Sequence, residues 1–447
     1  MRLLVSRRST GDSAPSHNLP TNKWLTRLTE SPLVVALVGA AFIVIGTYGR
    51  IPRFVADSEH YIAIAEGKAA MVAAPFSKRI LHPYVVRGVA TVTHQSVATG
   101  FTAIACISCF AFLFLVALTL KGYGVQPIVC LPLLLTPLLF ERTWDAYLPD
   151  LFHASLLGGF FYSYATEKRR TAWVLLLMAT LTRETTLLLC LMILVFELLG
   201  RRRKVALGAL AAGIIGTAVS SLLASHSQPN IHGLGTFAYL ASKVLYNVLR
   251  NWLGVMLWMN TFGWKCSLAY SVVLPGWVHL GDIQKLGVCS WDPGVPLRTI
   301  LIVLTEFGLA GTVALRALAP GWRSCLNGMP RGVRLSYWYG LVAFVVGTVT
   351  GASVSRLVGY GWPAFWVAVP VLLMPGSLLR PRSLPIFMLA HSALCWMPSV
   401  VACLFGVGPL INAFQIGVAF AAHVFAWRSL APAALSPRAF LPNPNLS

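Results

Sequence analysis

The sequence is poor in charged residues, and it is poorest in acidic ones. Charged residues make up 11% of its 447 positions, and 14 Asp and Glu stand against 35 Lys and Arg. Hydrophobic residues reach 57%, and the mean hydropathy is +0.71. This balance excludes an ordinary water-soluble domain and predicts a polytopic membrane protein.

The motifs of several enzyme classes are also missing. The sequence contains no GxxxxGK[ST] phosphate loop, no GxGxxG, no HExxH and no GxSxG, so ATPase and soluble-enzyme functions have no support. The formal charge of +21 suggests nucleic acid, but the basic residues lie mostly in short segments between apolar runs. Membrane topology and anionic headgroups explain that distribution, so no nucleic-acid partner is expected. Cys266 and Cys289 share one segment and could form a disulfide.

Long apolar runs are what the sequence does contain. A spanning helix needs about 20 apolar residues, and in lipid only helices or a closed barrel satisfy the backbone. The sequence therefore predicts an all-α transmembrane bundle of about 10 to 12 segments within residues 31–430. The full-length candidates are Pro32–Tyr48, Ala98–Leu120, Gln126–Phe140, Asp150–Thr166, Val205–Ala224, Thr299–Ala317, Tyr337–Ser355, Trp362–Leu379, Ile386–Leu404 and Pro409–Trp427.

The distribution of charge orients this bundle. The first 30 residues form a polar, basic arm with no apolar core near Met1, so the first span is expected to be an anchor and the arm cytoplasmic. The other basic clusters then fall on the same side, and so does the tail, residues 431–447. Nine of the fourteen acids fall on the outer side: Asp57, Glu59, Glu66, Glu141, Asp145, Asp150, Glu184, Asp282 and Asp292.

One apolar region is interrupted by charge. Thr171–Gly200 carries Arg183 and Glu184 at its middle, which leaves two apolar halves too short to span a bilayer. We expect two short helices that meet near the outer face, with these two residues at the apex. The alternative is one straight helix whose Arg and Glu are neutralised by a neighbour. Ionisable residues at membrane depth are functional candidates in either case.

The first predicted outer loop, residues 50–97, contains two candidate interfacial helices. Asp57 has the position of a helix N-cap for Ser58–Gly67, and a second helix is expected from Leu81 to Val92. Asp57 and Glu59 are the candidate catalytic carboxylates. Lys78 and Arg79 are candidates for binding an anionic group.

Three further outer segments are predicted, at residues 141–150, 225–298 and 355–362. Asp145 has two interpretations, a site residue or a solvated loop acid. Asp150 also has two, a site residue or a helix N-cap. The segment 225–298 is rich in aromatics, which fit a sugar or prenyl surface as well as an interfacial belt. Arg356 offers donors matched to phosphate oxygens, or it snorkels at a helix end.

Together these segments resemble the GT-C superfamily of membrane glycosyltransferases. The resemblance covers most of the chain and rests on Asp57-Ser58-Glu59, Lys78-Arg79-x-x-x-Pro83, the acidic loop 141–150, Thr182-Arg183-Glu184 and Arg356-x-x-x-Tyr360-x-x-Pro363. It implies sugar transfer from a polyprenyl-phosphate donor to a glycan, lipid or protein acceptor outside a bacterial inner membrane. Asp57 would be the general base of an inverting reaction, helped by Glu59. The implied substrate-binding residues are Lys78, Arg79, Asp145, Asp150, Arg183, Glu184, Arg356 and Tyr360.

The match departs from the family in its carboxylates. Many members carry Asp-Glu, Asp-Asp or Asp-x-Asp where this chain has Asp-x-Glu, so a requirement for a divalent cation stays open and no other cofactor is expected. Two other functions fit the sequence less well. A transporter or flippase for a lipid-linked or anionic solute would also use broken helices, but no inverted repeat is evident. A scaffold subunit without catalysis is the third.

Overall fold

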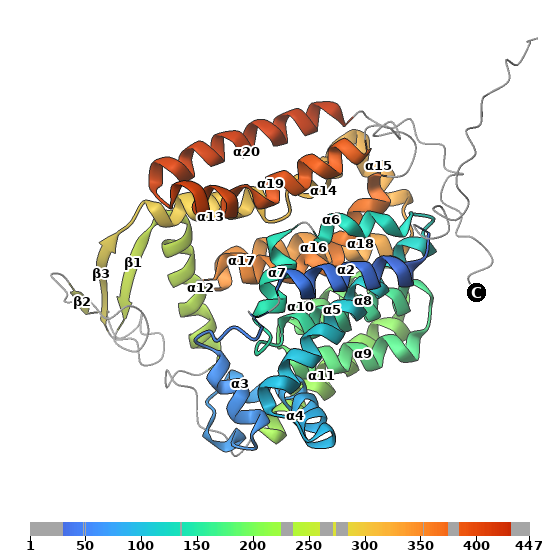
Figure 1. The fold of residues 1–447 in the computed structure, drawn as a ribbon, viewed down its shortest axis with the longest axis vertical. Coiled ribbons are helices and arrows are strands. Elements are labelled where there is room, and N and C mark those ends of the chain that lie inside the picture. Colours follow the sequence, from blue (N-terminus) through green and yellow to red (C-terminus); the bar gives the residue numbers. More distant parts are fainter. Residues whose placement is uncertain are drawn as a thin grey trace, which may run out of the picture.

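The structure is a computed structural model that describes residues 30–47, 49, 51–134, 136–224, 236–259, 271–273, 285–351, 353–373 and 384–430. The expected basic arm, the C-terminal tail and much of the outer segment 225–298 lie outside these residues. The described chain is mostly helical and includes one small sheet (Figure 1). The all-α class expected from the apolar runs is therefore confirmed for the bundle.

Six helices in the described part of the chain are long and apolar enough to cross a membrane. They are α5 (Val97–Gly122), α11 (Arg203–Leu223), α16 (Arg331–Thr350), the run Val354–Leu373, α19 (Leu384–Phe405) and α20 (Pro409–Ser429). A bent pair, α13 (Gly294–Thr305) and α14 (Leu309–Arg316), makes a seventh if it counts as one broken span. The chain is a multi-pass membrane protein. Among the residues that the structure describes, only these candidates meet the length criterion, fewer than the expected 10 to 12 segments.

The difference arises from shorter helices and from proline. The helices α2 (Pro32–Gly46), α8 (Asp150–Ala165) and α10 (Thr186–Leu199) lie in apolar runs but fall short of a full span. The expected span Gln126–Phe140 is wrong as one helix. It divides into η3 (Pro127–Cys130), α6 (Leu131–Leu134) and α7 (Pro137–Trp144). Proline lacks the amide donor and clashes inside a helix, which explains a break at each segment start.

The interruption in Thr171–Gly200 is present. The helix α9 (Arg169–Thr182) ends where Arg183 adopts an extended backbone, and α10 starts at Thr186. The α13–α14 pair is bent by 74° around Glu306–Gly308. Gly308 has a φ of 44°, and a Cβ there would lie 2.6 Å from Nδ1 of His391. A glycine is therefore needed for α13 and α14 to bend against α19.

The centre of the bundle is built around α5, which packs on α2 and α8. Beside it α8 packs on α9, α9 packs on α11, and α11 packs on α10. A further central run joins α17 (Val354–Val358), η5 (Gly359–Gly361) and α18 (Trp362–Leu373), and it packs on α16. Its 3₁₀ turn comes close to α16, because a Cβ on Gly361 would lie 2.6 Å from the carbonyl oxygen of Gly340. This run brings the Arg356 segment into the bundle interior.

The periphery supports a lipid environment. On α20, Leu410 is 86% exposed and Phe414 is 70% exposed, and α2, α11 and α19 also expose large apolar side chains. Water would penalise such faces by roughly 1.5–3 kcal/mol for each large side chain left uncovered. Contact with lipid hydrocarbon removes that cost. In Figure 1 α19 and α20 run side by side along one flank of the molecule.

The two helices expected in residues 50–97 are present at the end opposite α20 in Figure 1, and their place at a membrane interface stays a prediction. They are α3 (Ser58–Ala65) and α4 (Leu81–Thr93), joined by η1 (Ala69–Met71) and η2 (Phe76–Lys78). Tyr61, Val86 and Phe101 form a small apolar core that fixes α3 and α4 on α5. This packing sets the position of Asp57 and Arg79 relative to the bundle.

The helix α12 (Thr236–Leu253) leads from the bundle to a three-stranded antiparallel sheet with strand order β1-β3-β2. The strands are β1 (Val255–Met259), β2 (Ser271–Val273) and β3 (Lys285–Trp291), and Leu257 pairs with Val288. Cys289 in β3 is disulfide-bonded. Its expected partner, Cys266, lies outside the described residues.

Candidate functional site

Asp150 is the centre of a buried cluster of charges. It is the first residue of α8, and its side chain is only 3% exposed. Its Oδ2 accepts a hydrogen bond of 2.7 Å from Nε of Arg356 and lies 3.5 Å from Nη1 of Arg142. Arg183 forms an ion pair with the other carboxylate oxygen. Asp150 is thus held by guanidinium groups from α7, α17 and the α9–α10 break.

Arg356 connects this centre to Asp57. Its Nη1 donates to Oδ2 of Asp57 at 2.7 Å, while its Nε binds Asp150. Asp57 precedes α3 as expected, but its side chain makes no capping hydrogen bond. Because 31% of the Asp57 side chain is exposed, against 3% for Asp150, Asp57 is the more accessible of the two carboxylates.

A second pair closes the cluster on the side of η2. Nε of Arg79 donates to Glu184 at 2.8 Å, and its Nη1 donates to the Tyr61 hydroxyl at 2.9 Å. Burial opposes the charge of Arg79, but the Glu184 carboxylate outweighs burial and raises the pKa of Arg79 well above its ordinary value. Desolvation opposes the charge of Glu184, whose side chain is 45% exposed, and Arg79 overcomes it, lowering the Glu184 pKa to about 2. Both groups are therefore charged at neutral pH.

Arg183 and Tyr360 stack at the back of the cluster. The guanidinium carbon of Arg183 lies 4.5 Å from the centroid of the Tyr360 ring. Within this cluster, three buried donors have no hydrogen-bond partner among the described residues: Nε of Arg183, Nη2 of Arg356 and the Tyr360 hydroxyl. Buried donors without acceptors are costly. The cluster therefore has spare donors for an anionic oxygen.

The fold thus brings together seven of the ten residues singled out in the sequence. The charged members are Asp57, Arg79, Asp150, Arg183, Glu184 and Arg356, and Tyr360 stacks on Arg183. Three others lie apart. The Glu59 side chain is 68% exposed, and its Oε1 lies 4.0 Å from Nε2 of His60. Lys78 is exposed on η2, and Asp145 binds Nε of Arg53 at 2.8 Å. Their predicted roles stay predictions.

Sequence reasoning missed several members of the site. Arg142 lies between Asp150 and the carbonyl oxygen of Ser355, 3.4 Å from that oxygen. His153, one turn after Asp150 on α8, contacts the Thr186 hydroxyl at 2.8 Å. Lys243 of α12 interacts electrostatically with Arg79, Glu184 and Asp57. Arg142 had a signal, because it is the one basic residue in an outer segment with three acids. His153 and Lys243 lie in helices with no local sign of a site.

The described residues contain no group of three or more His, Cys, Asp or Glu arranged to hold a metal ion. A scan against models of known protein families and a search of curated proteins give no match to this chain. The assignment of a function therefore depends on the residues of the cluster itself.

Proposed function

We propose that the chain is a membrane glycosyltransferase that moves a sugar from a polyprenyl-phosphate donor to an acceptor on the extracytoplasmic face of a bacterial inner membrane. The observation that carries this proposal is the chain of contacts Asp57–Arg356–Asp150. It combines an accessible carboxylate with a buried set of guanidinium groups that keeps unpartnered donors. Transfer from a lipid phosphate needs both a base and cations for the leaving group.

In this reaction the Asp57 carboxylate takes the proton of the acceptor hydroxyl. The hydroxyl oxygen attacks the anomeric carbon, the bond from that carbon to the phosphate oxygen breaks, and the prenyl phosphate leaves with the electron pair. Arg356 and Arg183 supply donors for the charge on that oxygen. Asp150 holds both guanidinium groups in place and is too enclosed to act as a nucleophile. With Asp57 as the single base and Asp150 enclosed, inversion at the anomeric carbon is expected.

Two observations support the outer side. Disulfides persist in oxidising compartments outside the cytoplasm, and Cys289 is disulfide-bonded. The sheet that holds Cys289 follows α12, whose Lys243 interacts with Asp57 and Glu184. This continuity supports placing the disulfide and the charge cluster on the same side of the bundle. A bacterial cell-envelope role agrees with the cytoplasmic arm expected from the basic N-terminus.

A transporter or flippase is the second candidate, and the 74° bend between α13 and α14 favours it. Broken helices at membrane depth are common at transporter binding sites. The two functions differ in whether a glycosidic bond breaks. A flippase would move the lipid-linked sugar between leaflets and leave the sugar attached.

The test uses the full chain in liposomes with a panel of polyprenyl-phosphate-linked hexoses and pentoses. We expect transfer of one sugar by the wild type and a loss of roughly 10²- to 10⁴-fold with Asp57→Asn, as for removal of a general base. Glu66→Gln, an exposed acid of the same loop paired with Lys68, is the matched control and keeps the wild-type rate. Wild-type transfer by Asp57→Asn would refute the catalytic role. Lipid movement without transfer would establish the flippase instead.

A further inference from the structure

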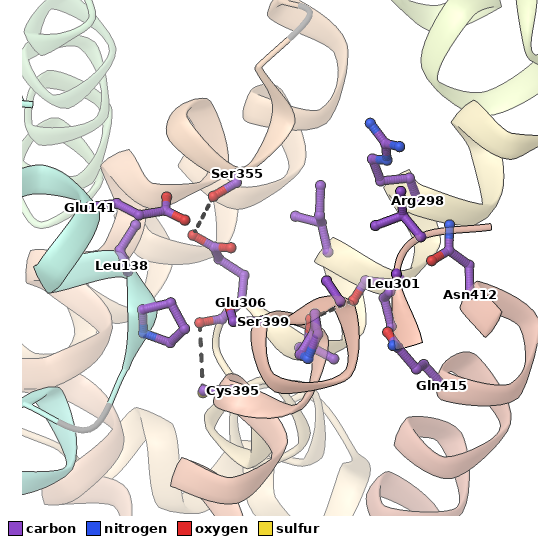
Figure 2. A pocket seen from close by; sticks show the side chains of 17 residues that line it. Leu138, Glu141, Arg298, Leu301, Glu306, Ser355, Cys395, Ser399, Asn412 and Gln415 are labelled. Atoms are coloured by element: carbon purple, nitrogen blue, oxygen red, sulfur yellow. Dashed lines mark hydrogen bonds between the residues drawn. The ribbon is translucent and has the colours of Figure 1, made fainter. Parts of the chain in front are cut away.

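A cavity lies outside the charge cluster, between α7, α13, α19 and α20. Its volume is about 260 Å³, and Figure 2 shows its lining. Gly406 and Val407, in the short loop between α19 and α20, form part of the wall. Neither Asp57 nor Asp150 lines the cavity, so it requires a separate explanation from the proposed reaction.

One end of the cavity is acidic. Glu306 lies at the bend between α13 and α14, and its Oε1 accepts a hydrogen bond of 3.0 Å from the Ser355 hydroxyl. Glu141 of α7 lines the cavity beside this pair, and Figure 2 shows the three side chains gathered together. The Glu141 carboxylate lies close enough to act electrostatically on Glu306. The negative end of the α13 helix dipole adds to this field.

The basic residues nearby do not fill this end. Arg142 attracts both carboxylates electrostatically, but it does not line the cavity, and its guanidinium is engaged by Asp150 and the Ser355 carbonyl oxygen. Arg298 of α13 lines the cavity and is exposed, and Figure 2 shows it away from the two glutamates. The acidic end is therefore open to a cationic group.

The opposite wall carries amides. Asn412 and Gln415, three residues apart on α20, line the cavity across from the glutamates (Figure 2). Gln415 is 2% exposed, and its Oε1 has no hydrogen-bond partner among the described residues. A buried acceptor without a donor is costly, and a ligand with hydroxyl or amine donors would satisfy it.

The size of the cavity decides between a bare ion and a molecule. A water molecule takes about 30 Å³ of liquid volume, so the cavity has room for roughly eight waters. A single metal ion would leave most of that space empty, and the described residues hold no three-ligand metal cluster. A small organic molecule fits both the volume and the separation of the acidic end from the amides.

We propose that this cavity binds a hydroxylated organic amine, with the ammonium group between Glu141 and Glu306 and the hydroxyl groups on Gln415 and Asn412. The ammonium offsets the negative charge at this end of the cavity and donates to both side chains. The hydroxyls give the Gln415 oxygen its missing donor. This inference does not depend on glycosyl transfer, because the cavity is lined by different residues from the proposed catalytic cluster.

The test compares glucosamine with glucose, which have the same ring but differ in the cationic amine. Binding is measured by isothermal titration calorimetry on the purified full chain in nanodiscs. We expect saturable binding of glucosamine and at least about tenfold weaker binding of glucose, because hydrogen bonds to charged groups are stronger than those between neutral groups. Glu306→Gln removes one carboxylate without changing its shape, and it should weaken glucosamine binding by a similar factor.

A second variant guards against a misfolded Glu306→Gln protein. Ala402 of α19 lines the cavity, and Ala402→Phe fills it without touching a charge, so glucosamine binding should be lost. Glu66→Gln is the charge-matched control and should bind as the wild type does. Equal binding of both sugars, no glucosamine binding, or unchanged binding by both cavity variants would each overturn the proposal. Loss of sugar transfer would not, because that activity is tested through Asp57.

Discussion

Replacing Asp150 with Asn should destabilise the protein far more than the same change at Asp57. Asp150 is 3% exposed and faces three guanidinium groups, with Nε of Arg356 at 2.7 Å and Nη1 of Arg142 at 3.5 Å. Removing one partner of a buried ion pair costs about 3–5 kcal/mol, because the remaining charges stay buried. Asn keeps one oxygen as an acceptor for Arg356, so we expect the low end of that range, about 3 kcal/mol.

Asp57 makes a useful contrast on the same arginine. It contacts Arg356 at 2.7 Å, but 31% of its side chain is exposed to solvent. Accessible ion pairs contribute about 0–1 kcal/mol, and we expect no more than that from Asp57→Asn. The two substitutions make the same chemical change in one cluster. They should therefore separate a carboxylate that holds the site together from one that is available to react.

The assay is reversible unfolding of the purified protein in mixed micelles by titration with SDS, followed by the fluorescence of its 14 tryptophans. Glu66→Gln is the control and should stay within about 0.5 kcal/mol of the wild type, as surface changes usually do. An Asp150→Asn protein within about 1 kcal/mol of the wild type would refute the buried-cluster reasoning. So would an Asp57→Asn protein that loses as much stability as Asp150→Asn.

Three further predictions concern the same architecture. Arg356→Ala should raise the apparent donor KM roughly tenfold or more by removing charged hydrogen bonds. The control is Arg428→Ala, at a distant and exposed position, which should leave the donor KM unchanged. Equal effects of the two substitutions would refute the role of Arg356 in binding the phosphate. Because the folded-state pKa of Glu184 is lowered to about 2 from 4.5, its stabilisation is present above pH 4.5 and is lost as the pH falls toward 2. The difference in unfolding free energy between wild type and Glu184→Gln should shrink over that window, and a constant difference would contradict it. Finally, a membrane-impermeant thiol reagent should label Glu59→Cys on intact cells and Arg170→Cys only after permeabilisation, and the reverse pattern would invert the proposed topology.

Most of the helical framework was predictable from the sequence, because apolar runs and proline act locally. The break at Arg183 follows from two charged residues between short apolar halves, and α9 and α10 indeed end and start there. The segment Gln126–Phe140 was wrongly predicted to be one helix. Its high hydropathy indicated a single span, whereas the prolines at its helix starts divide it into shorter helices. Most residues of the candidate site could also be selected from the sequence, because acids and arginines in the predicted outer segments are few in so apolar a chain.

The roles within the site were not predictable, since they depend on contacts between residues far apart in the chain. Asp57 and Arg356 are 299 residues apart, and Asp150 and Arg356 are 206 apart. The sequence allowed Asp57 and Asp150 to be helix caps, and the fold instead turns both carboxylates to Arg356. It also treated Asp57 and Glu59 as a pair, although only Asp57 reaches the cluster.

The sequence by itself determined that this is a helical membrane protein, because hydropathy is a property of segments, and it predicted that most of its scarce carboxylates share one side of the membrane. Only the tertiary structure decided which acid is enclosed and which is accessible. That distinction follows from how many guanidinium groups the packed helices bring to each carboxylate, and packing is what sets burial and the cost of removing a charge. The acidic cavity at the α13–α14 bend was likewise invisible until Glu141, Glu306 and Gln415, from three separate helical regions, met around one space.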